Sequence, residues 1–338
     1  MIAVGVRADR AVAPPLLEVR DLSVAFTRRG EPDAVAVDGI SFDVAPGEVV
    51  GLVGESGCGK SVTSLAIMRL LPERGNRVTG EVRLDGTDLL TLSAAAMRGR
   101  RGRDLSMVFQ DPLSSLNPVV PIGVQVTEVL RRHRGMRKEP ARREAAELLD
   151  RVGISDARRR LDSYPHQMSG GMRQRALIAI ALACRPRLLI ADEPTTALDV
   201  TIQAQILGLL AELVAETGTA LIMITHDLGV VAGLCDTVNV LYGGRIVERA
   251  QRHRLFATPR HPYTHGLLRS IPRLDSPPGE ELPAIRGSVN DNLPWADACA
   301  FAPRCPRAVE TCEERTPPSD VVGGRLLRCH NPVPANAE

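Results

Sequence analysis

The chain has 338 residues, of which 44% are hydrophobic, so it can bury a full core and a second, smaller unit. Its 42 lysines and arginines nearly cancel its 40 aspartates and glutamates, so the net charge gives no reason to expect a nucleic-acid or anionic-membrane partner. Seven cysteines, an odd number at uneven spacing, argue against a secreted disulfide framework and for a reducing cytoplasm.

The N-terminal part is predicted to be a short extension followed by strands. Residues 1–15 lack an apolar core of signal-peptide length, so we expect a flexible extension there. Apolar and β-branched residues predict strands over residues 16–26, 34–44 and 49–53, with turns at "RRGEPD" and "APGE" between them. A helix is predicted to follow over residues 60–71.

The segment "GESGCGKS" stands between the third predicted strand and this helix. It matches the pattern G-x-x-x-x-G-K-[ST], and the strand–loop–helix context favours a phosphate-binding loop over a plain glycine-rich turn. Backbone N–H groups and the helix N-terminus would hold phosphates, Lys60 would reach the outer pair, and Ser61 would ligate Mg²⁺. The predicted nucleotide-binding residues of the loop are Gly54, Glu55, Ser56, Gly57, Cys58, Gly59, Lys60 and Ser61.

The middle of the chain is predicted to be largely helical. A short apolar strand in "LSMVFQDP" precedes Gln110, and from about residue 122 to 161 apolar residues recur at helical spacing among many charges. We therefore expect a helical subdomain of about residues 111–183. Its arginine runs lack interleaved aromatic residues, so solvated helix faces are favoured over a nucleic-acid site. The longest uninterrupted apolar run, "ALIAIALAC", is about half of what crosses a bilayer, so no segment is expected to span a membrane alone.

Two adjacent carboxylates follow the apolar run "LLIA". Asp192, at the end of this predicted strand, could hold Mg²⁺, and Glu193 could accept a proton from an attacking water. Because side chains alternate along a strand, neighbouring carboxylates can serve one ligand only where the strand ends. A surface turn is the simpler interpretation of "DEP" alone, but its combination with the phosphate loop favours catalysis.

Ser169, Gly170 and Gly171 begin a long apolar helix, so a second helix N-terminus is available to an anion. Taken alone, "SGG" at a helix start is a common cap. Because it stands about twenty residues before the acidic strand end, however, it resembles the signature sequence of ATP-binding cassette (ABC) proteins.

The resemblance covers roughly residues 16–252 and implies an α/β fold of the P-loop NTPase type: an ABC ATP-binding domain with an antiparallel β subdomain and a helical subdomain. In this family two such domains pair head to tail, and each ATP, with Mg²⁺, lies between one subunit's phosphate loop and the other's signature. The resemblance assigns catalysis to Gln110, Glu193 and His226, and Mg²⁺ binding to Ser61, Gln110 and Asp192. It assigns contact with the partner's ATP to Ser169, Gly170, Gly171 and Met172. It also gives Asp199 a D-loop role and has Phe26 stack on adenine. For Phe26 a plain core position, and for His226 a structural role, stay open as alternatives.

The stretch that runs from "SGGMRQRALIAIALAC" to "ALDVTIQAQIL" is similar to the ATPase subunits of bacterial dipeptide and oligopeptide importers, with nickel importers as near relatives. "HPYTHGLLRSIP" and "CAFAPRCPRAVETC" resemble that family's C-terminal extension, expected here over residues 253–338 with little regular structure. The resemblance implies a non-identical partner ATPase, two transmembrane permease subunits, an extracytoplasmic peptide-binding protein, and a peripheral position on the cytoplasmic face of the inner membrane.

Four late cysteines, Cys299, Cys305, Cys312 and Cys329, stand in a segment with few apolar residues. Four thiolates could bind an iron–sulfur cluster such as [4Fe-4S], or zinc, and either would stabilise a small, proline-rich fold. The spacings lack the tight C-x-x-C pairs of zinc ribbons, and reduced, packed thiols are the third alternative. We expect a cluster ahead of the other two.

Two other classes of function stay open. A soluble ABC ATPase acting on nucleic acid or ribosomes commonly carries two cassettes or a long coiled coil, whereas this chain has one phosphate loop and no sustained heptads. A simple phosphoryl-transfer enzyme would leave "MSGGM" without a role. The sequence therefore predicts an ATPase that powers peptide uptake.

Overall fold

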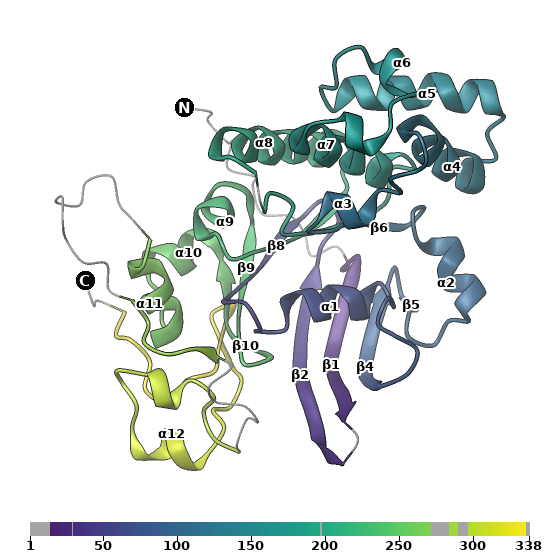
Figure 1. Cartoon of the computed structure of the whole chain (residues 1–338). Coiled ribbons are helices and arrows are strands. Elements are labelled where there is room, and N and C mark those ends of the chain that lie inside the picture. The colour runs from purple at the N-terminus through teal and green to yellow at the C-terminus, as the bar shows by residue number, and fades with distance from the viewer. Residues whose placement is uncertain (1–13, 29, 197, 272–283, 290–296, 336–338) are drawn as a thin grey trace.

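The computed structural model describes residues 14–28, 30–196, 198–271, 284–289 and 297–335 (Figure 1). Nearly all of the predicted N-terminal extension falls outside these ranges. The described part consists of two sheets, a group of helices, and a C-terminal region that packs beside the larger sheet (Figure 1).

The smaller sheet is antiparallel and comes from the N-terminal strands. Its order is β2-β1-β4-β5, built from β1 (Leu17–Arg28), β2 (Glu31–Val44), β4 (Asn76–Leu84) and β5 (Thr87–Asp88). Buried apolar residues alternate along β1, with a register shift before Leu22, so one face of the sheet is apolar. The two strands predicted here are present, and both extend further into the intervening turn than expected.

The larger sheet has eight strands in the order β11-β12-β10-β9-β3-β8-β7-β6. Its parallel part consists of β9 (Thr237–Tyr242), β3 (Val49–Val53), β8 (Ala220–Thr225), β7 (Leu188–Asp192) and β6 (Leu105–Val108). β10 (Arg245–Gln251), β12 (Arg325–Leu327) and β11 (Asp320–Val322) extend it antiparallel. Every residue of β3, β7 and β8 is buried, so these apolar runs form the centre of the core.

Helices occupy most of residues 112–182 and lie together with neighbouring helices on one side of the molecule (Figure 1). The α-helices of this segment are α3 (Pro112–Ser115), α4 (Ile122–Arg134), α5 (Lys138–Arg151), α6 (Ala157–Arg160) and α7 (Gly170–Leu182). Ile122, Val126 and Leu130 recur at four-residue spacing on α4 and are buried where α4 packs against α5. α1 (Lys60–Ile67) follows β3, and α2 (Ala94–Arg100) follows β5.

α8 (Val200–Thr217) and α9 (Leu228–Leu234) complete the alternation of strands and helices. Among the described residues, α8 alone is long and apolar enough to cross a membrane. The sequence analysis did not predict this, because it considered only uninterrupted apolar runs, and isolated polar residues interrupt the apolar residues of α8. The length and composition of α8 are weak evidence of a membrane span, since core helices meet the same criteria. Ile206, Leu210 and Leu213 of α8 are buried against the rest of the chain.

The C-terminal region is more regular than predicted. It contains α10 (Arg252–Ala257), α11 (Pro262–Arg269), α12 (Glu310–Glu314), β11 and β12, so the expectation of little regular structure was wrong. Each of the two strands has only three residues and exists because it pairs with the existing sheet edge at β10. Phe301 is buried against Tyr242 and Tyr263, so a small aromatic core joins this region to the larger sheet.

Candidate active site

The segment between β3 and α1 forms a tight loop, and at two of its positions the backbone angles and close neighbours allow only glycine. Gly54 has φ 152°, and a Cβ there would lie 2.3 Å from the carbonyl oxygen of Leu241. Gly59 has φ 92° and caps α1, and a Cβ there would lie 2.3 Å from the carbonyl oxygen of Ala36. The loop N–H groups therefore stand at the N-terminus of α1, which favours an anion.

Lys60 and Ser61, the last two residues of the loop, are the first two of α1. The Lys60 ammonium is nearly buried and donates to the carbonyl oxygens of Gly54 at 2.8 Å and Glu55 at 2.9 Å. Burial lowers the pKa of Lys60, because the charged form loses water, and nearby acidic groups oppose this shift.

Ser61 meets the predicted magnesium carboxylate at the end of β7. Its Oγ donates to Asp192 Oδ1 at 3.0 Å, although the two residues are 131 apart in sequence. Burial raises the pKa of Asp192, and the Ser61 hydrogen bond counteracts that effect. A hydroxyl and a carboxylate are hard oxygen ligands of the kind that Mg²⁺ prefers, so this pair fits the ion.

Glu193 lies one residue beyond the end of β7, with φ 45°, and this left-handed step takes it out of strand geometry. Its Oε2 accepts hydrogen bonds from Gln110 Nε2 at 3.1 Å and from Thr196 Oγ1 at 3.0 Å. Its Oε1 lies 3.3 Å from His226 Nδ1. The structure thus brings together three side chains that the sequence predicted as a catalytic group, and adds Thr196, which the sequence analysis missed.

The signature residues begin α7, whereas the phosphate loop leads into α1. Ser169 is the N-cap of α7, and its Oγ accepts a hydrogen bond from the Met172 N–H at 3.3 Å. Gly170 packs beside Leu198, and a Cβ on Gly171 would lie 3.0 Å from Ile202 of α8. Figure 1 places α7 among the helices on one side of the molecule and α1 beside the sheets. The tip of α7 is therefore next to the segment after Glu193.

Asp199 and Phe26 occupy two different places. Asp199 is the N-cap of α8, where its carboxylate accepts a hydrogen bond from the Ile202 N–H at 3.0 Å, so it lies beside the signature. Phe26 is half-buried on β1, opposite Ala34 and Asn76, and packs against the core. Adenine stacking by Phe26 stays a prediction.

The four late cysteines gather in the C-terminal region without forming a metal site. They lie near enough that the other three thiols help to raise the pKa of Cys329, after burial as the main cause, to about 12. Yet no group of three His, Cys, Asp or Glu side chains in the described residues has an arrangement that could hold a metal ion. Charges on neighbouring thiols influence one another over longer distances than a metal–sulfur bond spans, so this pKa shift does not imply a metal site. The structure therefore does not support the expected iron–sulfur cluster or zinc.

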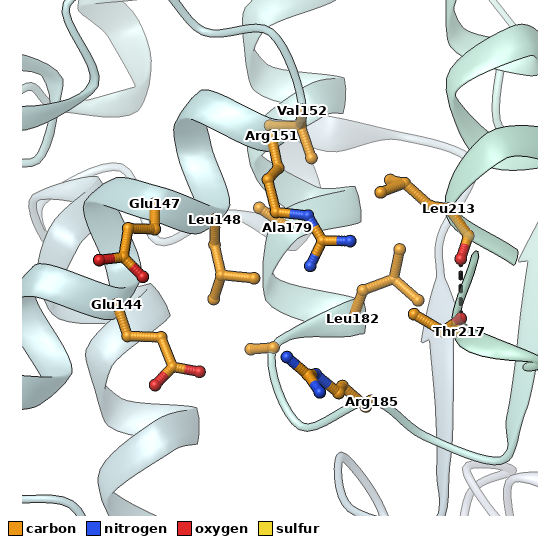
Figure 2. A pocket seen from close by; sticks show the side chains of 11 residues that line it. Glu144, Glu147, Leu148, Arg151, Val152, Ala179, Leu182, Arg185, Leu213 and Thr217 are labelled. Carbon is orange, nitrogen blue, oxygen red and sulfur yellow. Dashed lines mark hydrogen bonds between the residues drawn. The ribbon is translucent and has the colours of Figure 1, made fainter.

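A small cavity in the helical part, of about 70 Å³, lies away from all these residues (Figure 2). Leu148 of α5, Leu182 of α7 and Leu213 of α8 contribute to its walls. Thr217 closes one side and donates to the Leu213 carbonyl at 2.7 Å. The cavity contains none of the predicted nucleotide-binding side chains.

A parallel sheet with a glycine loop between β3 and α1, and with carboxylates at the end of a neighbouring strand, defines a phosphate-loop NTPase. The chain matches the family model described as "ABC transporter" over residues 37–196 and that described as "Oligopeptide/dipeptide transporter, C-terminal region" over residues 247–312. The chain therefore belongs to the ATP-binding subunits of ABC transporters, and it is an ATPase.

Two relatives and one solved structure illustrate this membership. The chain is 50% identical over 318 residues to the oligopeptide transport ATP-binding protein OppD of Salmonella typhimurium, with 94% of each chain covered. It is 51% identical over 320 residues to AppD, the oligopeptide transport ATP-binding protein of Bacillus subtilis, with 93% of this chain and 96% of the relative covered. The dimeric ATP-binding cassette MJ0796, bound to ADP and Pi, is similar with a TM-score of 0.63 and 29% identity over 70% of this chain and 98% of that one. The predicted fold class is thereby confirmed.

Proposed function

We propose that this chain hydrolyses ATP to power the import of dipeptides or oligopeptides through separate membrane permease subunits. The observation that carries the proposal is the join of an ABC cassette to a C-terminal region of the oligopeptide/dipeptide transporter type, with relatives of 50% identity named for oligopeptide transport. A nickel importer of the same family is the alternative substrate class. Uptake of labelled peptide by membranes that contain the assembled complex, with nickel uptake measured beside it, separates the two.

Within the active site, we assign the general base to Glu193. Its hydrogen bonds from Gln110 and Thr196 and its contact with His226 fix the carboxylate, which can take a proton from the attacking water. His226 and Gln110 would position the γ-phosphate and the water. Ser61, Asp192 and Gln110 would hold Mg²⁺, which neutralises charge that develops on the phosphates.

A dimer with a second, non-identical ATPase subunit would complete each ATP site. Support comes from the position of the α7 tip, where a Cβ on Gly171 would lie 3.0 Å from Ile202 of α8, so the signature packs beside α8. The N–H groups at Ser169, Gly170, Gly171 and Met172 would then bind the ATP held by the partner subunit, with Asp199 at the interface.

The permease subunits would dock on the helical part, at the cytoplasmic face of the membrane. Leu113 is 60% exposed and Val119 is 78% exposed, and both follow Gln110 closely in sequence. Exposed apolar side chains so near a proposed catalytic residue would let a permease segment act on the site. An extracytoplasmic peptide-binding protein would deliver the solute to the complex.

The second candidate is a soluble ABC ATPase that acts on nucleic acid or ribosomes. Its binding surface would be the arginine-rich helices. Arg142 pairs with Asp162 at 2.7 Å, and Arg151 pairs with Glu216 at 2.6 Å. These arginines are partly neutralised within the chain, which favours the importer. Recovery of the tagged protein with two membrane subunits supports the importer, whereas recovery with ribosomes or nucleic acid contradicts it.

Two further assignments stay proposals. The first is the division at about residue 252 into an ABC domain and a C-terminal extension, with the helical subdomain at about residues 111–183. The second is a [4Fe-4S] cluster or zinc on the four late cysteines, although no metal-holding arrangement is present among the described residues. Its support is that the cysteines share one small region, where the Cys299 N–H donates to the Cys312 carbonyl at 2.8 Å. Iron, zinc and sulfide analysis of anaerobically purified protein tests it, and metal-free protein with full ATPase activity contradicts it.

A further inference from the structure

The phosphate loop contacts the C-terminal region through Glu55, whose side chain is not among the proposed Mg²⁺ ligands or catalytic groups. Arg304 Nη1 donates to Glu55 Oε2 at 2.7 Å, and Arg304 Nη2 donates to Glu55 Oε1 at 2.9 Å. This bidentate pair joins residues that are 249 positions apart in sequence. The C-terminal region therefore holds the second residue of the loop directly.

The Arg304 side chain is buried and uses its hydrogen-bond donors at this position. It is only 4% exposed, and its remaining donors bond the carbonyl oxygens of Arg286 at 2.7 Å and Gly287 at 3.0 Å and the Tyr242 hydroxyl at 3.3 Å. All five guanidinium N–H groups thus have acceptors. A buried, bidentate arginine is far more specific in geometry than an exposed ion pair, and a lysine could not replace it.

Tyr263 holds the same residue from a second direction. Its buried hydroxyl accepts a hydrogen bond from the Glu55 backbone N–H at 2.9 Å. The "HPY" sequence explains its placement, because the His261 Nδ1 caps α11 by accepting the Tyr263 N–H and Pro262 is the first helical residue. The Tyr263 ring packs against Tyr242, with ring centres 4.7 Å apart.

Glu55 also connects to the phosphate-binding lysine. Its carbonyl oxygen accepts a hydrogen bond from Lys60 Nζ at 2.9 Å. One residue is therefore held by Arg304 through its carboxylate and by Tyr263 through its N–H, while it orients Lys60 through its carbonyl. A displacement of Glu55 would move both a loop N–H group and a partner of Lys60.

We propose that Arg304 and Tyr263 are positioning residues of the phosphate loop, so that the packing of the C-terminal region sets the affinity of the cassette for ATP. Both residues bond Glu55, and in this proposal they act through it. The proposal rests on ATP binding by this loop, and it adds a dependence of that binding on the C-terminal region. By linkage, bound ATP must stabilise the contact in return.

The first test compares ATP binding by the full chain with single substitutions. Arg304→Met and Tyr263→Phe should each weaken binding of a fluorescent ATP analogue with Mg²⁺ by about 10-fold, within the roughly 5- to 150-fold range of coupled sites. Arg307→Met is the matched control, because Arg307 lies in the same region and bonds Asn331 but has no bond to the loop among the described residues. Its affinity for ATP should stay within about 2-fold of the unsubstituted chain.

A double substitution separates the proposed linkage from general loosening of the fold. Glu55→Gln with Arg304→Met should lose no more affinity than the worse single variant, because both changes break one connection. Full additivity of the two losses would overturn the proposal. A second result would also overturn the proposal: Arg304→Met and Tyr263→Phe could bind ATP with unchanged affinity and yet unfold at a lower temperature. That result would mean that the contact only stabilises the fold.

Hydrogen exchange of the unsubstituted chain gives a test that needs no folded variant. ATP with Mg²⁺ should slow backbone exchange around residues 299–305 and in α11, relative to the same protein without nucleotide. Unchanged exchange there, in a chain that binds ATP, contradicts the inference and leaves the ATPase assignment intact. A chain that binds no ATP at all contradicts the proposed function and this inference together.

Discussion

The carboxylate of Glu193 is fixed by neighbours on different segments of the chain, which makes it a clean target at the scale of single residues. Glu193→Gln keeps the size of the side chain but cannot accept a proton from water. We expect this variant to bind ATP and to turn it over at least ~100-fold more slowly, since general-base assistance is typically worth that much. Single-turnover hydrolysis and equilibrium binding of ATP measure the two effects separately. Turnover near that of the unsubstituted protein would remove Glu193 from its assigned role.

His261 makes the stability of the chain dependent on pH. It is fully buried, and this burial lowers its pKa to about 3, although its ring also bonds the Arg328 backbone. Because the unfolded chain binds a proton near the ordinary histidine value and the folded chain does not, the contribution of His261 is complete at neutral pH and is lost as pH falls from about 6.5 towards 3. Within that window, stability should fall by about 1.4 kcal/mol per pH unit from this residue.

His261→Asn provides the comparison for this prediction, since asparagine is also a good N-cap and does not titrate here. Urea unfolding at pH 7, 6 and 5 should show a steeper loss of stability in the unsubstituted chain than in the variant. Other histidines with a lowered pKa, such as His133 and His265, contribute equally to both proteins. Parallel stability curves for the two proteins would show that His261 is not the group responsible.

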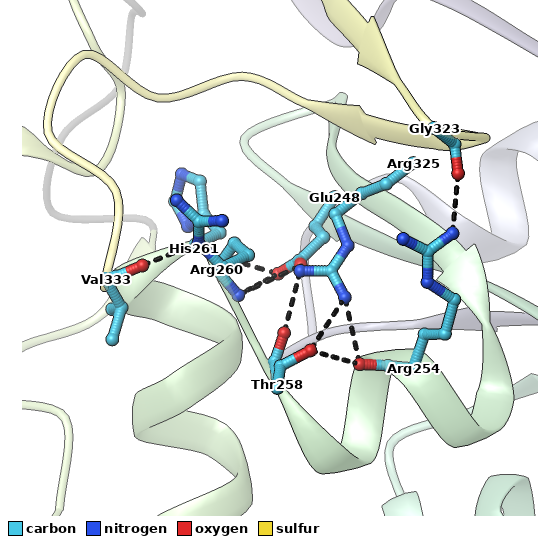
Figure 3. A network of polar contacts seen from close by, with 8 residues as sticks. All are labelled: Glu248, Arg254, Thr258, Arg260, His261, Gly323, Arg325 and Val333. Atoms are coloured by element: carbon cyan, nitrogen blue, oxygen red, sulfur yellow. Dashed lines mark hydrogen bonds and ion pairs between the residues drawn. The ribbon is translucent and has the colours of Figure 1, made fainter. Parts of the chain in front are cut away.

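At the scale of elements, Glu248 of β10 joins α11 and β12 to the larger sheet. Figure 3 shows its carboxylate between the start of α11 and Arg325. It is fully buried, accepts the backbone N–H groups of Arg260 at 3.0 Å and His261 at 2.9 Å, and lies 3.4 Å from Arg325. Arg325 also donates to the Thr258 carbonyl at 2.7 Å.

This arrangement predicts an order of stability among variants. Glu248→Leu should destabilise the chain more than Arg325→Leu. It leaves one buried and one partly buried N–H group without their acceptor, at roughly 1–3 kcal/mol for each group, and it removes the ion-pair partner of Arg325. Arg325→Leu leaves the Glu248 carboxylate bonded to both N–H groups. Glu248→Gln, which still offers an acceptor, should rank between Glu248→Leu and the unsubstituted chain. Denaturant unfolding of the four proteins gives the order, and a larger loss for Arg325→Leu would contradict it.

Elements with strong local patterns were predictable, and those that depend on distant partners were not. The apolar runs of β3 and β7 and the glycine loop before α1 are local features, so the sequence indicated the phosphate loop and the strand-end carboxylates. β11 and β12 have three residues each, too few for any periodicity to show. Arg304 gives no local sign that its carboxylate partner lies in the phosphate loop.

The same contrast applies to the site residues. Thr196 could have been found, because a threonine three residues after a strand-end carboxylate can bond back to it, as it does at 3.0 Å. The cysteine spacings gave a poor guide to geometry, because thiols that share a region can still lack the arrangement of a metal site. The number of cysteines gives the number of available metal ligands, but it does not predict where the folded backbone places their thiols.

At the scale of the whole molecule, the site is divided between two surfaces of the chain. The phosphate loop, Asp192 and Glu193 lie at the ends of β3 and β7, whereas Ser169 and the two glycines after it lie at the tip of α7. In the proposed dimer, one chain would supply half of each of two ATP sites. Binding of ATP to its own loop and hydrolysis of ATP in the assembled complex should therefore respond differently to changes at the signature.

Ser169→Arg tests this division. The substitution adds a long, charged side chain at a helix tip that is proposed to face the partner's ATP, and it removes the cap of α7. ATP binding by the isolated chain should stay within about 2-fold, since Ser169 has no hydrogen bond with its own loop among the described residues. Turnover by the complex should fall by roughly 100-fold, the usual cost of losing an anion-stabilising donor at a reacting phosphate or oxyanion. Ser169→Thr, which can still cap α7, serves as the control and should retain most of the activity. Hydrolysis by the complex at an undiminished rate in Ser169→Arg would mean that the α7 tip has no part in catalysis, and that each chain completes its ATP site alone.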